Sequence, residues 1–379
     1  MKVCQFSVDH KVNDVRIYGR ISKTLARNGY EVLVIGNGDP VADDTIRSIG
    51  LNGTSLTQGK VISTFFAVFN HVNQHSECDI YHLHDPLSIP IGIWLKLRGK
   101  KVIYDVHEFY DLWFSGKDDT HPLYRYALLP LIHVLEPILC RLADAVIVVD
   151  EAMTRYDRYN STVIHNFGYK DRFTPTPHTS NGIPTFIYAG TFKPERATLE
   201  LIKAVKHTPA TKLILLGEFY RESYRQDCLD YVQQNDLSDR VEFIEWLPHD
   251  KVPSVMAKAD VGVVALKSDG WLRKVAYPNK LGEYLGMGLP VLVPDSPRLR
   301  GMVRGSRCGI WCDFSDPKDI ARAMRIFCDF QTLRTDYGEN GRALVDTVMN
   351  WENEEPKLLE VYRHVCRNYR DPQLLGVAG

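Results

Sequence analysis

The chain has 379 residues, more than a single hydrophobic core of about 250–300 residues usually supports, so two domains are expected. Apolar residues make up 44% of the chain and charged residues 25%, which predicts a packed globular protein. The 46 basic and 47 acidic side chains give a formal net charge of −1, which argues against a nucleic-acid-binding protein with a basic surface.

Neither cysteine spacing nor hydropathy indicates a metal centre, a signal peptide or a membrane span. Of the eight cysteines, only Cys308 and Cys312 lie close together, and no nearby histidine pair completes a zinc site. Free thiols in a reducing cytoplasm are the simplest interpretation. The chain opens directly on an apolar strand, and its longest apolar-rich stretch, Leu123–Val149, is interrupted by charged residues. We therefore expect a soluble cytoplasmic protein.

In the first half, short apolar runs alternate with longer amphipathic stretches. A helix is predicted over Val12–Asn28, closed by Gly29, and strands are predicted over Lys2–Val8, Glu31–Ile35, Asp79–Leu83, Lys101–Tyr104 and Ala145–Val149. Short apolar runs suit strands that are buried on both faces, and helical spacers suit the crossovers between parallel strands. The first half is therefore expected to form a doubly wound parallel sheet.

The second half repeats the scheme. Strands are predicted over Thr185–Tyr188, Lys212–Leu216, Val241–Ile244, Val261–Leu266 and Leu289–Val293. The Pro- and Thr-rich stretch before them is typical of a connector, and the tail has a helical apolar pattern over Trp351–Tyr369. The expected organisation is an α/β domain over residues 1–166, a linker over 167–184, a second α/β domain over 185–350 and a C-terminal helix over 351–379.

Residues Tyr277–Val291 give the strongest local signal. Pro278 suits the first turn of a helix that Gly288 terminates. The free N–H groups of that turn favour an anion, and Lys280 adds a positive charge beside them. Glu283, one turn further on, could accept hydrogen bonds from a ribose diol. The alternative is an ordinary capped helix with an exposed Lys and Glu.

A second signal lies where the first strand of the second half ends. Gly190 lets the backbone approach a ligand, and Lys193 and Arg196 follow within one turn. Gly217 stands in the same position after the next strand. Strand ends that carry glycines and cations predict a clamp for a nucleotide diphosphate, because open parallel sheets bind ligands at the carboxyl ends of their strands.

Polar residues also follow the strands of the first half. His84 and Asp85 end one predicted strand, and His107 and Glu108 end the next. Residues His10, Asp14 and Arg16 lie in the first strand-to-helix turn. Each histidine alone is more often structural than catalytic, but two strand ends that each carry a His–acid pair favour a functional crevice.

The order and spacing of these segments resemble glycosyltransferase family 4, the group 1 retaining enzymes of GT-B architecture, over nearly the whole chain. The resemblance implies two Rossmann-like domains that face each other across a cleft. The segments that carry it are Val163–Asn166, Tyr188–Ala204, Val241–Leu266, Pro278–Pro290, Cys308–Ile310 and Trp351–Glu352.

The resemblance also implies roles for both domains. Residues 1–166 would bind the acceptor, residues 185–350 the nucleotide sugar, and the final helix would cross back to the first domain. His107 would orient the sugar, with Arg196 and Lys280 at the reacting centre. The expected acceptor-binding residues are His10, Asp14, Arg16, His84, Asp85 and Glu108. The expected donor-binding residues are Gly190, Thr191, Lys193, Arg196, Gly217, Leu247, Pro278, Asn279, Lys280, Leu281 and Glu283.

The implied reaction is retaining transfer from a UDP- or GDP-sugar to a glycan, a glycolipid, a lipid-linked acceptor or a small molecule, in bacterial polysaccharide or glycoconjugate synthesis. No Asp-x-Asp motif is present to hold a divalent ion, so we expect no metal and no cofactor. Two departures leave the transferred sugar open. Val275 stands where family members often carry the first of two glutamates, and Thr191 and Arg196 replace the usual Arg and Lys of the phosphate loop.

Several alternatives remain. A nucleotide-sugar epimerase would share this architecture, and a non-catalytic sugar-nucleotide-binding protein would be consistent with the two departures. A dehydrogenase is disfavoured because no G-x-G-x-x-G opens a helix after the first strand. The aromatic helix over Val61–Val72 is predicted to pack in the core. The alternative is peripheral contact with the inner face of a membrane, but only Lys60 flanks the helix.

Overall fold

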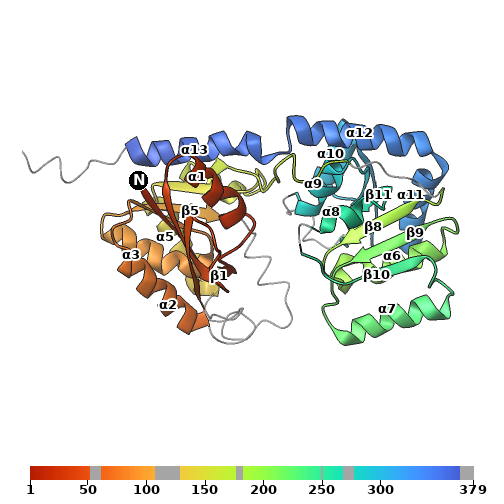
Figure 1. Ribbon diagram of the computed structural model, residues 1–379, viewed down its shortest axis with the longest axis horizontal. Helices are drawn as coiled ribbons and strands as arrows, with labels where there is room; N and C mark the ends of the chain where they lie inside the picture. Colours follow the sequence, from red (N-terminus) through yellow and green to blue (C-terminus); the bar gives the residue numbers. More distant parts are fainter. Residues whose placement is uncertain (52–60, 107–128, 176–181, 249–250, 268–276, 368–379) are drawn as a thin grey trace, which may run out of the picture. The chain divides into compact units, whose positions relative to one another are not determined.

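The computed structural model describes residues 1–51, 61–106, 129–175, 182–248, 251–267 and 277–367. The chain folds into two compact units, residues Met1–Asn166 with Asn353–Gly379 and residues Phe167–Glu352. Each unit is an α/β unit built on a parallel sheet (Figure 1).

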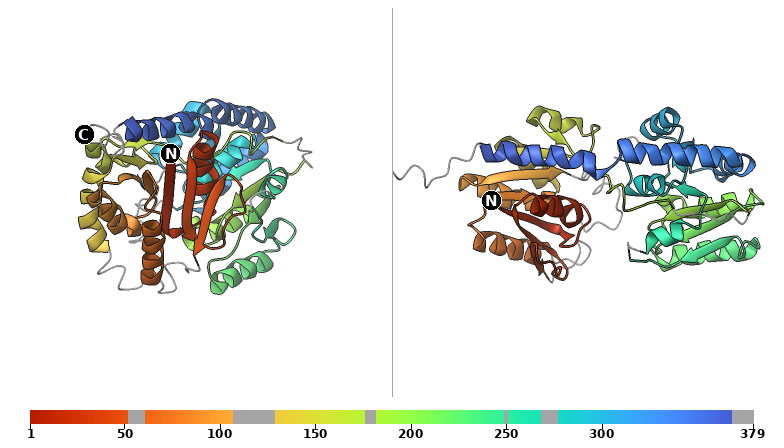
Figure 2. Two further views of the ribbon diagram at one scale, coloured as in Figure 1. Left: turned by 60° about the vertical axis from the view of Figure 1, so that its left-hand side comes forward. Right: turned by 45° about the horizontal axis from the view of Figure 1, so that its top comes forward.

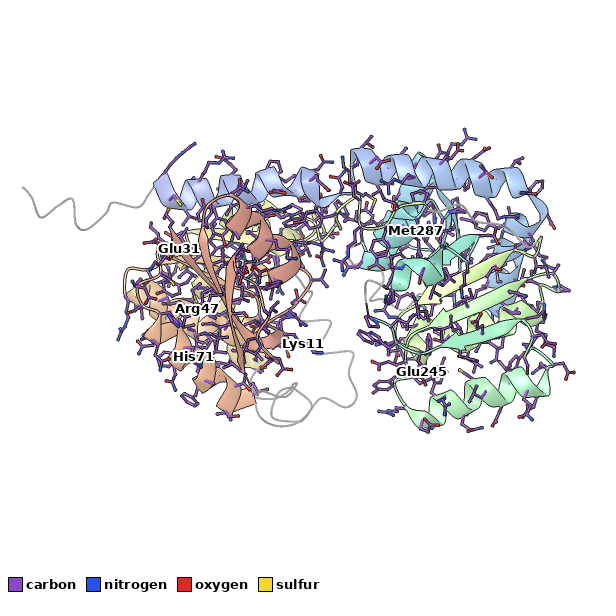
Figure 3. The ribbon with its side chains drawn as sticks, in the orientation of Figure 1. Lys11, Glu31, Arg47, His71, Glu245 and Met287 are labelled. Atoms are coloured by element: carbon purple, nitrogen blue, oxygen red, sulfur yellow. The ribbon has the colours of Figure 1, made fainter. Side chains whose placement is uncertain are left out.

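Unit 1 has a sheet of seven strands in the order β3-β2-β1-β4-β5-β6-β7, and every pairing is parallel. In Figure 3, Glu31 marks the amino end of β2 and Lys11 the carboxyl end of β1. The strands are β1 Lys2–Lys11, β2 Glu31–Asn37, β3 Ile46–Leu51, β4 Ile80–Leu83, β5 Lys101–Val106, β6 Ala145–Val148 and β7 Thr162–Val163. The helices are α1 Lys23–Arg27, α2 Val61–Gln74, α3 Ile89–Leu97, α5 Leu129–Leu142 and α13 Trp351–Arg367, with 3-10 turns at Pro86–Ser88 and Thr154–Tyr159.

The first helix begins later than predicted. Strand β1 continues to Lys11, and a π-helical segment, Ile17–Ser22, leads into α1. The carboxylate of Asp14 sets this start, because its Oδ1 accepts hydrogen bonds from the backbone N–H groups of Arg16 (2.8 Å) and Ile17 (2.9 Å). The prediction of a helix from Val12 was therefore wrong by about one turn.

Unit 2 has a six-stranded parallel sheet in the order β10-β9-β8-β11-β12-β13. Its strands are β8 Thr185–Ala189, β9 Lys212–Leu216, β10 Val241–Ile244, β11 Val261–Val263, β12 Val291–Pro294 and β13 Gly309–Cys312. Its helices are α6 Thr198–Lys206, α7 Glu222–Gln234, α8 Val252–Met256, α9 Asn279–Gly286, α10 Pro297–Ser306, α11 Pro317–Asp329 and α12 Gln331–Thr347, with a 3-10 turn at Pro194–Arg196.

Both faces of the unit 2 sheet are covered by helices. Alternate residues of a strand point to opposite faces, and the core divides accordingly. Phe186 and Tyr188 of β8 pack with α6, α7 and α11, whereas Ile187 and Ala189 pack with α8, α9 and α10. Figure 2 shows helices on both sides of the strands. Burial on both faces explains why these strands are short, continuous apolar runs.

The predicted strands agree with the observed ones to within a few residues, and Lys212–Leu216 and Val241–Ile244 agree at both ends. Two strands were predicted to extend two or three residues beyond an observed end. Strand β11 ends at Val263 rather than Leu266, and β12 begins at Val291 rather than Leu289. Pro290 has no N–H to donate, which explains the later start of β12. Strands β3, β7 and β13 were not among the strands predicted from the apolar runs.

Helix α2 packs through Val61, Thr64, Val68 and Val72, as the core-packing interpretation predicted for this segment, while Phe66 on the same helix is 57% exposed. Within the residues that the structure describes, no helix has the length and apolar character needed to cross a membrane.

Near the end of the Met1–Asn166 segment of unit 1, a histidine lies between two carboxylates. His165 Nδ1 is 3.2 Å from Glu354 Oε1 of α13, and its Nε2 is 2.9 Å from Glu151 Oε1. Lys357 contacts the same Glu354 carboxylate at 2.9 Å. Burial opposes protonation of His165, but the hydrogen bonds and charges of Glu354 and Glu151 outweigh it and raise its pKa above 6.5. Burial likewise raises the pKa of Glu354, but His165 and Lys357 outweigh it and hold that pKa below 4.5.

This cluster predicts a pH-dependent stability. A raised histidine pKa contributes stability below pH 6.5 that is lost as the pH rises through the folded-state pKa. The lowered Glu354 pKa contributes stability that is lost only as the pH falls below 4.5. We expect urea denaturation to give a lower free energy of unfolding at about pH 8 than at about pH 6, and His165→Asn to reduce that difference. An undiminished difference in His165→Asn would contradict this assignment.

Candidate active site

The order of strands in unit 2 places a ligand position at its carboxyl edge. Strands β8, β9 and β10 progress in one direction across the sheet, and β11, β12 and β13 progress in the other, so the order reverses between β8 and β11. In open parallel sheets, ligands bind outside the carboxyl ends of the strands at this switch point. The predicted phosphate loop follows β8 directly, so it lies at the switch point of the sheet.

Two glycines let the loops after β8 and β9 approach each other. Gly190 N donates to Leu216 O (2.9 Å), and Gly217 N donates to Ile244 O (2.9 Å). A Cβ on Gly217 would lie 2.0 Å from the carbonyl oxygen of Gly190, and Gly217 has a φ of +151°. Both the contact and the backbone angle require glycine at position 217. The structure therefore places Gly190 and Gly217 together at adjacent strand ends.

Lys193 and Arg196 bring two cations to this edge. Arg196 closes the 3-10 turn Pro194–Arg196, and α6 starts two residues later. Within the described part of the chain, neither side chain forms an ion pair. Burial lowers the pKa of Lys193, the positive charge of Arg196 lowers it further, and Glu195 opposes both. Two neighbouring cations of this kind favour an anionic ligand.

Helix α9 carries the second half of the predicted donor site. It begins at Asn279, with Pro278 in the extended conformation at the N-cap. Lys280 Nζ lies 2.6 Å from Glu283 Oε2. We expected Lys280 on a diphosphate and Glu283 on a ribose, but in this structure the two side chains contact each other. Lys280 therefore holds the Glu283 carboxylate in this structure.

Three other predicted donor residues differ in exposure. The side chain of Leu281 is fully buried in the core, so its predicted contact with the nucleotide is wrong for the side chain. Leu247 is half-buried and packs against the same core. Thr191 is exposed, and its carbonyl accepts a hydrogen bond from Tyr188 Oη at 3.0 Å.

Tyr284 joins α9 to the end of β8, a contact that the sequence prediction missed. The Ala189 N–H donates a buried hydrogen bond of 2.8 Å to Tyr284 Oη. Gly262 of β11 makes room for the tyrosine, because a Cβ there would lie 2.3 Å from Tyr284 Cγ. A tyrosine on the apolar face of a helix needs a partner for its hydroxyl when buried, which is the signal that could have identified it.

Tyr284→Phe is expected to destabilise unit 2 by about 1–3 kcal/mol, because the Ala189 N–H would be left buried without an acceptor. Ala189 precedes Gly190, so donor affinity should weaken as well. Tyr337→Phe is a matched control. Among the described residues, the half-buried Tyr337 hydroxyl of α12 has no hydrogen-bond partner, so its loss should change little. Equal urea midpoints for both variants would contradict the role of Tyr284.

In unit 1, Asp85 is fully buried and serves the backbone. Its Oδ2 accepts hydrogen bonds from Val8 N (2.8 Å) and Ser88 Oγ (2.7 Å), and its Oδ1 accepts from Ser88 N (3.0 Å). These bonds join the ends of β1 and β4 and cap the 3-10 turn that follows. We therefore correct the prediction that Asp85 binds the acceptor: its carboxylate is used inside the protein.

A second buried network joins Arg16, His84 and Asp105. The Arg16 guanidinium donates to both oxygens of Asp105, at 2.8 and 2.9 Å, and to Ile164 O at 3.1 Å. His84 Nδ1 lies 3.1 Å from Asp105 Oδ2, and its Nε2 lies 3.0 Å from Gln5 Oε1. Arg16 is 3% exposed and His84 and Asp105 are 0% exposed. The prediction that Arg16 and His84 contact the acceptor is therefore wrong for this structure.

The remaining acceptor candidates have different positions. Asp14 caps the π-helical segment, and His10 is a half-buried residue near the end of β1 whose N–H donates to Ser7 Oγ at 2.7 Å. His107 and Glu108 lie outside the described residues.

Side chains of a type that can bind metals meet once in the described residues. Ligand atoms of His82, His84 and Asp105 lie within 4.8 Å of one another. The donor set does not suit a cation, however. Both Asp105 oxygens are engaged by the Arg16 guanidinium, which already supplies the positive charge at this position. His82 Nδ1 is 2.8 Å from the Tyr362 hydroxyl of α13.

Comparisons with known proteins bear on this geometry. The family model described as Glycosyltransferase Family 4 matches residues 16–167, and the one described as Glycosyl transferases group 1 matches residues 173–344. The second match contains every described residue of the proposed donor site.

A curated relative, the chitobiosyldiphosphodolichol beta-mannosyltransferase of Candida albicans (strain SC5314 / ATCC MYA-2876), is 23% identical over 298 residues. The match covers 68% of this chain and 62% of that protein, so the chain spans less than two thirds of the length of this relative.

Two solved structures are similar over almost the whole chain. Sucrose-phosphate synthase (tll1590) from Thermosynechococcus elongatus has a TM-score of 0.78 at 19% identity, covering 97% of this chain and 100% of that one. Anabaena Alr3699/HepE in complex with UDP-glucose has a TM-score of 0.71 at 15% identity, covering 96% of this chain and 99% of that one. At these identities the likeness shows the fold, which is that of two Rossmann-like domains.

Proposed function

We propose that this chain, which belongs to the glycosyltransferases of group 1 and family 4, transfers a sugar from a nucleotide diphosphate donor to an acceptor hydroxyl. The observation that carries the proposal is the pair Lys193 and Arg196, two cations without an ion pair among the described residues, beside the switch point of the unit 2 sheet. A diphosphate supplies the negative charge that such a position lacks.

Unit 2 would hold the donor. Gly190 and Gly217 leave the backbone open to the diphosphate, and the N-terminus of α9 adds N–H groups and the positive end of its dipole. Glu283, held by Lys280, would bind the ribose. A UDP- or GDP-sugar is the proposed donor class. The Anabaena structure that contains UDP-glucose supports a nucleotide sugar on this fold.

The proposed reaction is retaining and needs no metal. The bond between the anomeric carbon and the diphosphate oxygen breaks while the acceptor oxygen bonds on the same face, and the departing diphosphate accepts the acceptor's proton. Arg196, Lys193, Lys280 and the N–H groups of α9 would stabilise the charge that develops on the diphosphate. In this role protein cations substitute for the divalent ion that other sugar transfers use.

The acceptor is proposed to be a glycan, a glycolipid, a lipid-linked acceptor or a small molecule in bacterial polysaccharide or glycoconjugate synthesis. The proposed location is cytoplasmic, with peripheral contact to the inner face of the membrane as the alternative. The family membership supports a carbohydrate acceptor.

The test is to incubate the protein with UDP-, GDP- and ADP-sugars in EDTA, with a panel of glycan and lipid-linked acceptors. We expect acceptor-dependent release of one nucleoside diphosphate and a product whose anomeric configuration matches the donor by NMR. Isomerisation of the nucleotide sugar without transfer would establish an epimerase instead. Tight binding without turnover for any acceptor would favour a non-catalytic binding protein.

A further inference from the structure

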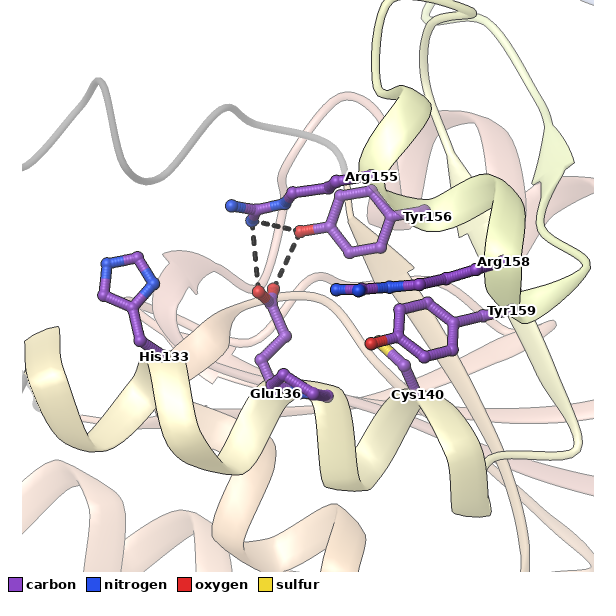
Figure 4. A pocket seen from close by; sticks show the side chains of 8 residues that line it. His133, Glu136, Cys140, Arg155, Tyr156, Arg158 and Tyr159 are labelled. Atoms are coloured by element: carbon purple, nitrogen blue, oxygen red, sulfur yellow. Dashed lines mark hydrogen bonds and ion pairs between the residues drawn. The ribbon is translucent and has the colours of Figure 1, made fainter.

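A cavity of about 140 Å³ opens on unit 1, and all the residues that line it belong to that unit. It lies between α5 and the 3-10 turn Thr154–Tyr159 (Figure 4). The lining residues are His133, Glu136, Pro137, Cys140, Arg155, Tyr156, Arg158 and Tyr159. None of them was singled out as a site residue by the sequence.

The carboxylate of the cavity is already satisfied. Glu136 Oε1 accepts hydrogen bonds from the hydroxyls of Tyr104 (2.8 Å) and Tyr156 (2.9 Å), and its Oε2 pairs with Arg155 at 3.1 Å. Glu136 is 6% exposed, and these contacts hold its carboxylate at the wall of the cavity. A carboxylate with this set of partners presents little free negative charge to a ligand.

Positive charge remains. The guanidinium of Arg158 lies over the ring of Tyr159 at 4.9 Å, and that of Arg141 lies 5.6 Å from the same ring. Arg158 forms no ion pair with any described residue. Among the described residues that line the cavity or contact Tyr159, the guanidinium groups of Arg141, Arg155 and Arg158 face one carboxylate, that of Glu136, so the basic side chains outnumber the acidic ones by two.

The same charges affect the pKa of the buried Cys140 thiol. Burial raises its pKa to about 12 and the charge of Glu136 raises it further, while Arg155, Arg158 and Arg141 each lower it. All three guanidinium groups and the carboxylate therefore lie close enough to Cys140 to affect the pKa of its thiol.

A hydroxyl without a partner points into that space. The Tyr159 hydroxyl is buried and has no hydrogen-bond partner among the described residues. In Figure 4 its oxygen and the Arg158 guanidinium both point toward the side of the cavity that Glu136 closes. A buried hydroxyl without a partner costs free energy that a bound acceptor oxygen would recover.

We propose that this cavity is a second anion site that binds the phosphoryl group of a ligand distinct from the sugar donor, through Arg158 and Tyr159. A phosphate monoester carries about −1.5 to −2 charges near pH 7, which matches the surplus of two, and its oxygens suit a guanidinium fork and a hydroxyl donor. The phosphate could belong to a soluble phosphorylated compound or to a lipid headgroup. Leu131, Val134 and Ile138 of α5, the helix that lines the cavity, are 41–63% exposed.

Calorimetric titration with inorganic phosphate tests the site. The wild-type protein should show two classes of phosphate site, the donor site and this cavity. Arg158→Ala should weaken the cavity site at least about tenfold and Tyr159→Phe about three- to tenfold, while Arg196→Ala should remove the other class only. Arg304→Ala is the matched control, because Arg304 is an exposed arginine of α10 without an ion pair in the described residues.

Retention of both phosphate classes in Arg158→Ala and Tyr159→Phe would overturn the proposal. Arg158 is exposed, so its variant should fold, and the thermal transition of each variant checks this. If the proposal of a phosphate site at this cavity fails, the proposed donor site of unit 2 still stands, because only Arg196→Ala tests that site.

Flotation with phosphatidylcholine vesicles, with and without phosphatidic acid, whose headgroup is a phosphate monoester, separates the two sources of phosphate. Binding that requires phosphatidic acid and weakens in Arg158→Ala assigns the cavity to a lipid headgroup. Phosphate binding without vesicle binding assigns it to a soluble phosphorylated ligand. Either result supports the site.

Discussion

Arg196→Ala is expected to lower kcat/KM for sugar transfer by about 10²–10³-fold, with little change in the free energy of unfolding. The guanidinium forms no ion pair in the described part of unit 2, so its removal breaks no internal contact of that kind. The diphosphate would lose a charged donor where negative charge develops on departure. Steady-state kinetics with the preferred nucleotide sugar, together with urea denaturation, measures both quantities.

Two variants sharpen this prediction. Arg196→Lys should recover only part of the activity, because an ammonium group keeps the charge but lacks the planar fork that binds two phosphate oxygens. Arg225→Ala removes an exposed arginine of α7 that pairs with Glu222 at 2.8 Å, and it should leave transfer unchanged. If Arg196→Ala had wild-type kinetics, Arg196 would not belong to the proposed donor site.

Asp105→Ala is expected to destabilise the protein by about 3–5 kcal/mol. Asp105 is 0% exposed and receives two hydrogen bonds from Arg16, which is itself 3% exposed. Its removal would leave a buried guanidinium without its counter-ion, and His84 would lose the partner of its Nδ1. Urea denaturation monitored by circular dichroism gives the change in the free energy of unfolding.

The cost should arise from the unpaired charge rather than from the missing carboxylate alone. The double variant Arg16→Met with Asp105→Leu should therefore recover much of the lost stability, since apolar replacement of a buried ion pair is often neutral or better. Glu222→Ala breaks an exposed pair of the same type on α7 and should cost at most about 1 kcal/mol. Equal losses in Asp105→Ala and Glu222→Ala would contradict the buried network.

Much of the fold could be predicted because its strands and helices follow from local patterns of apolar and polar residues. The strands of unit 2 are continuous apolar runs between helical spacers, so Lys212–Leu216 and Val241–Ile244 were predicted at both ends. Strand β3 was missed because only Ile46 and Leu51 at its ends are fully buried, and the residues between them are more exposed. A strand of this kind lacks the apolar run that marks its neighbours.

The candidate site was predictable where its residues follow one another in sequence. Gly190, Lys193 and Arg196 come within seven residues of a strand end, so a glycine turn with nearby cations could be recognised. Their contact with a nucleotide stays a prediction. The contact between Tyr284 and Ala189 joins residues 95 positions apart, and no local pattern reports such a pair.

In unit 1 the sequence did not show which polar side chains are buried. Polar residues after parallel strands indicate a ligand only when they are accessible, and His84 and Asp85 are both 0% exposed. Arg16 and Asp105 neutralise each other across 89 positions of the chain. The same residue types would look identical in sequence whether they lined a pocket or tied β1 to its neighbours.

Binding of nucleoside diphosphates to wild-type protein and to Arg196→Ala tests the central claim most directly. In a thermal-shift panel of UDP, GDP and ADP with EDTA present, we predict that at least one nucleotide raises the melting temperature of the wild-type protein. The same nucleotide should produce little or no shift in Arg196→Ala, while Arg225→Ala responds as the wild type does. An undiminished shift in Arg196→Ala, or no shift with any nucleotide, would contradict a donor site at the carboxyl edge of the unit 2 sheet.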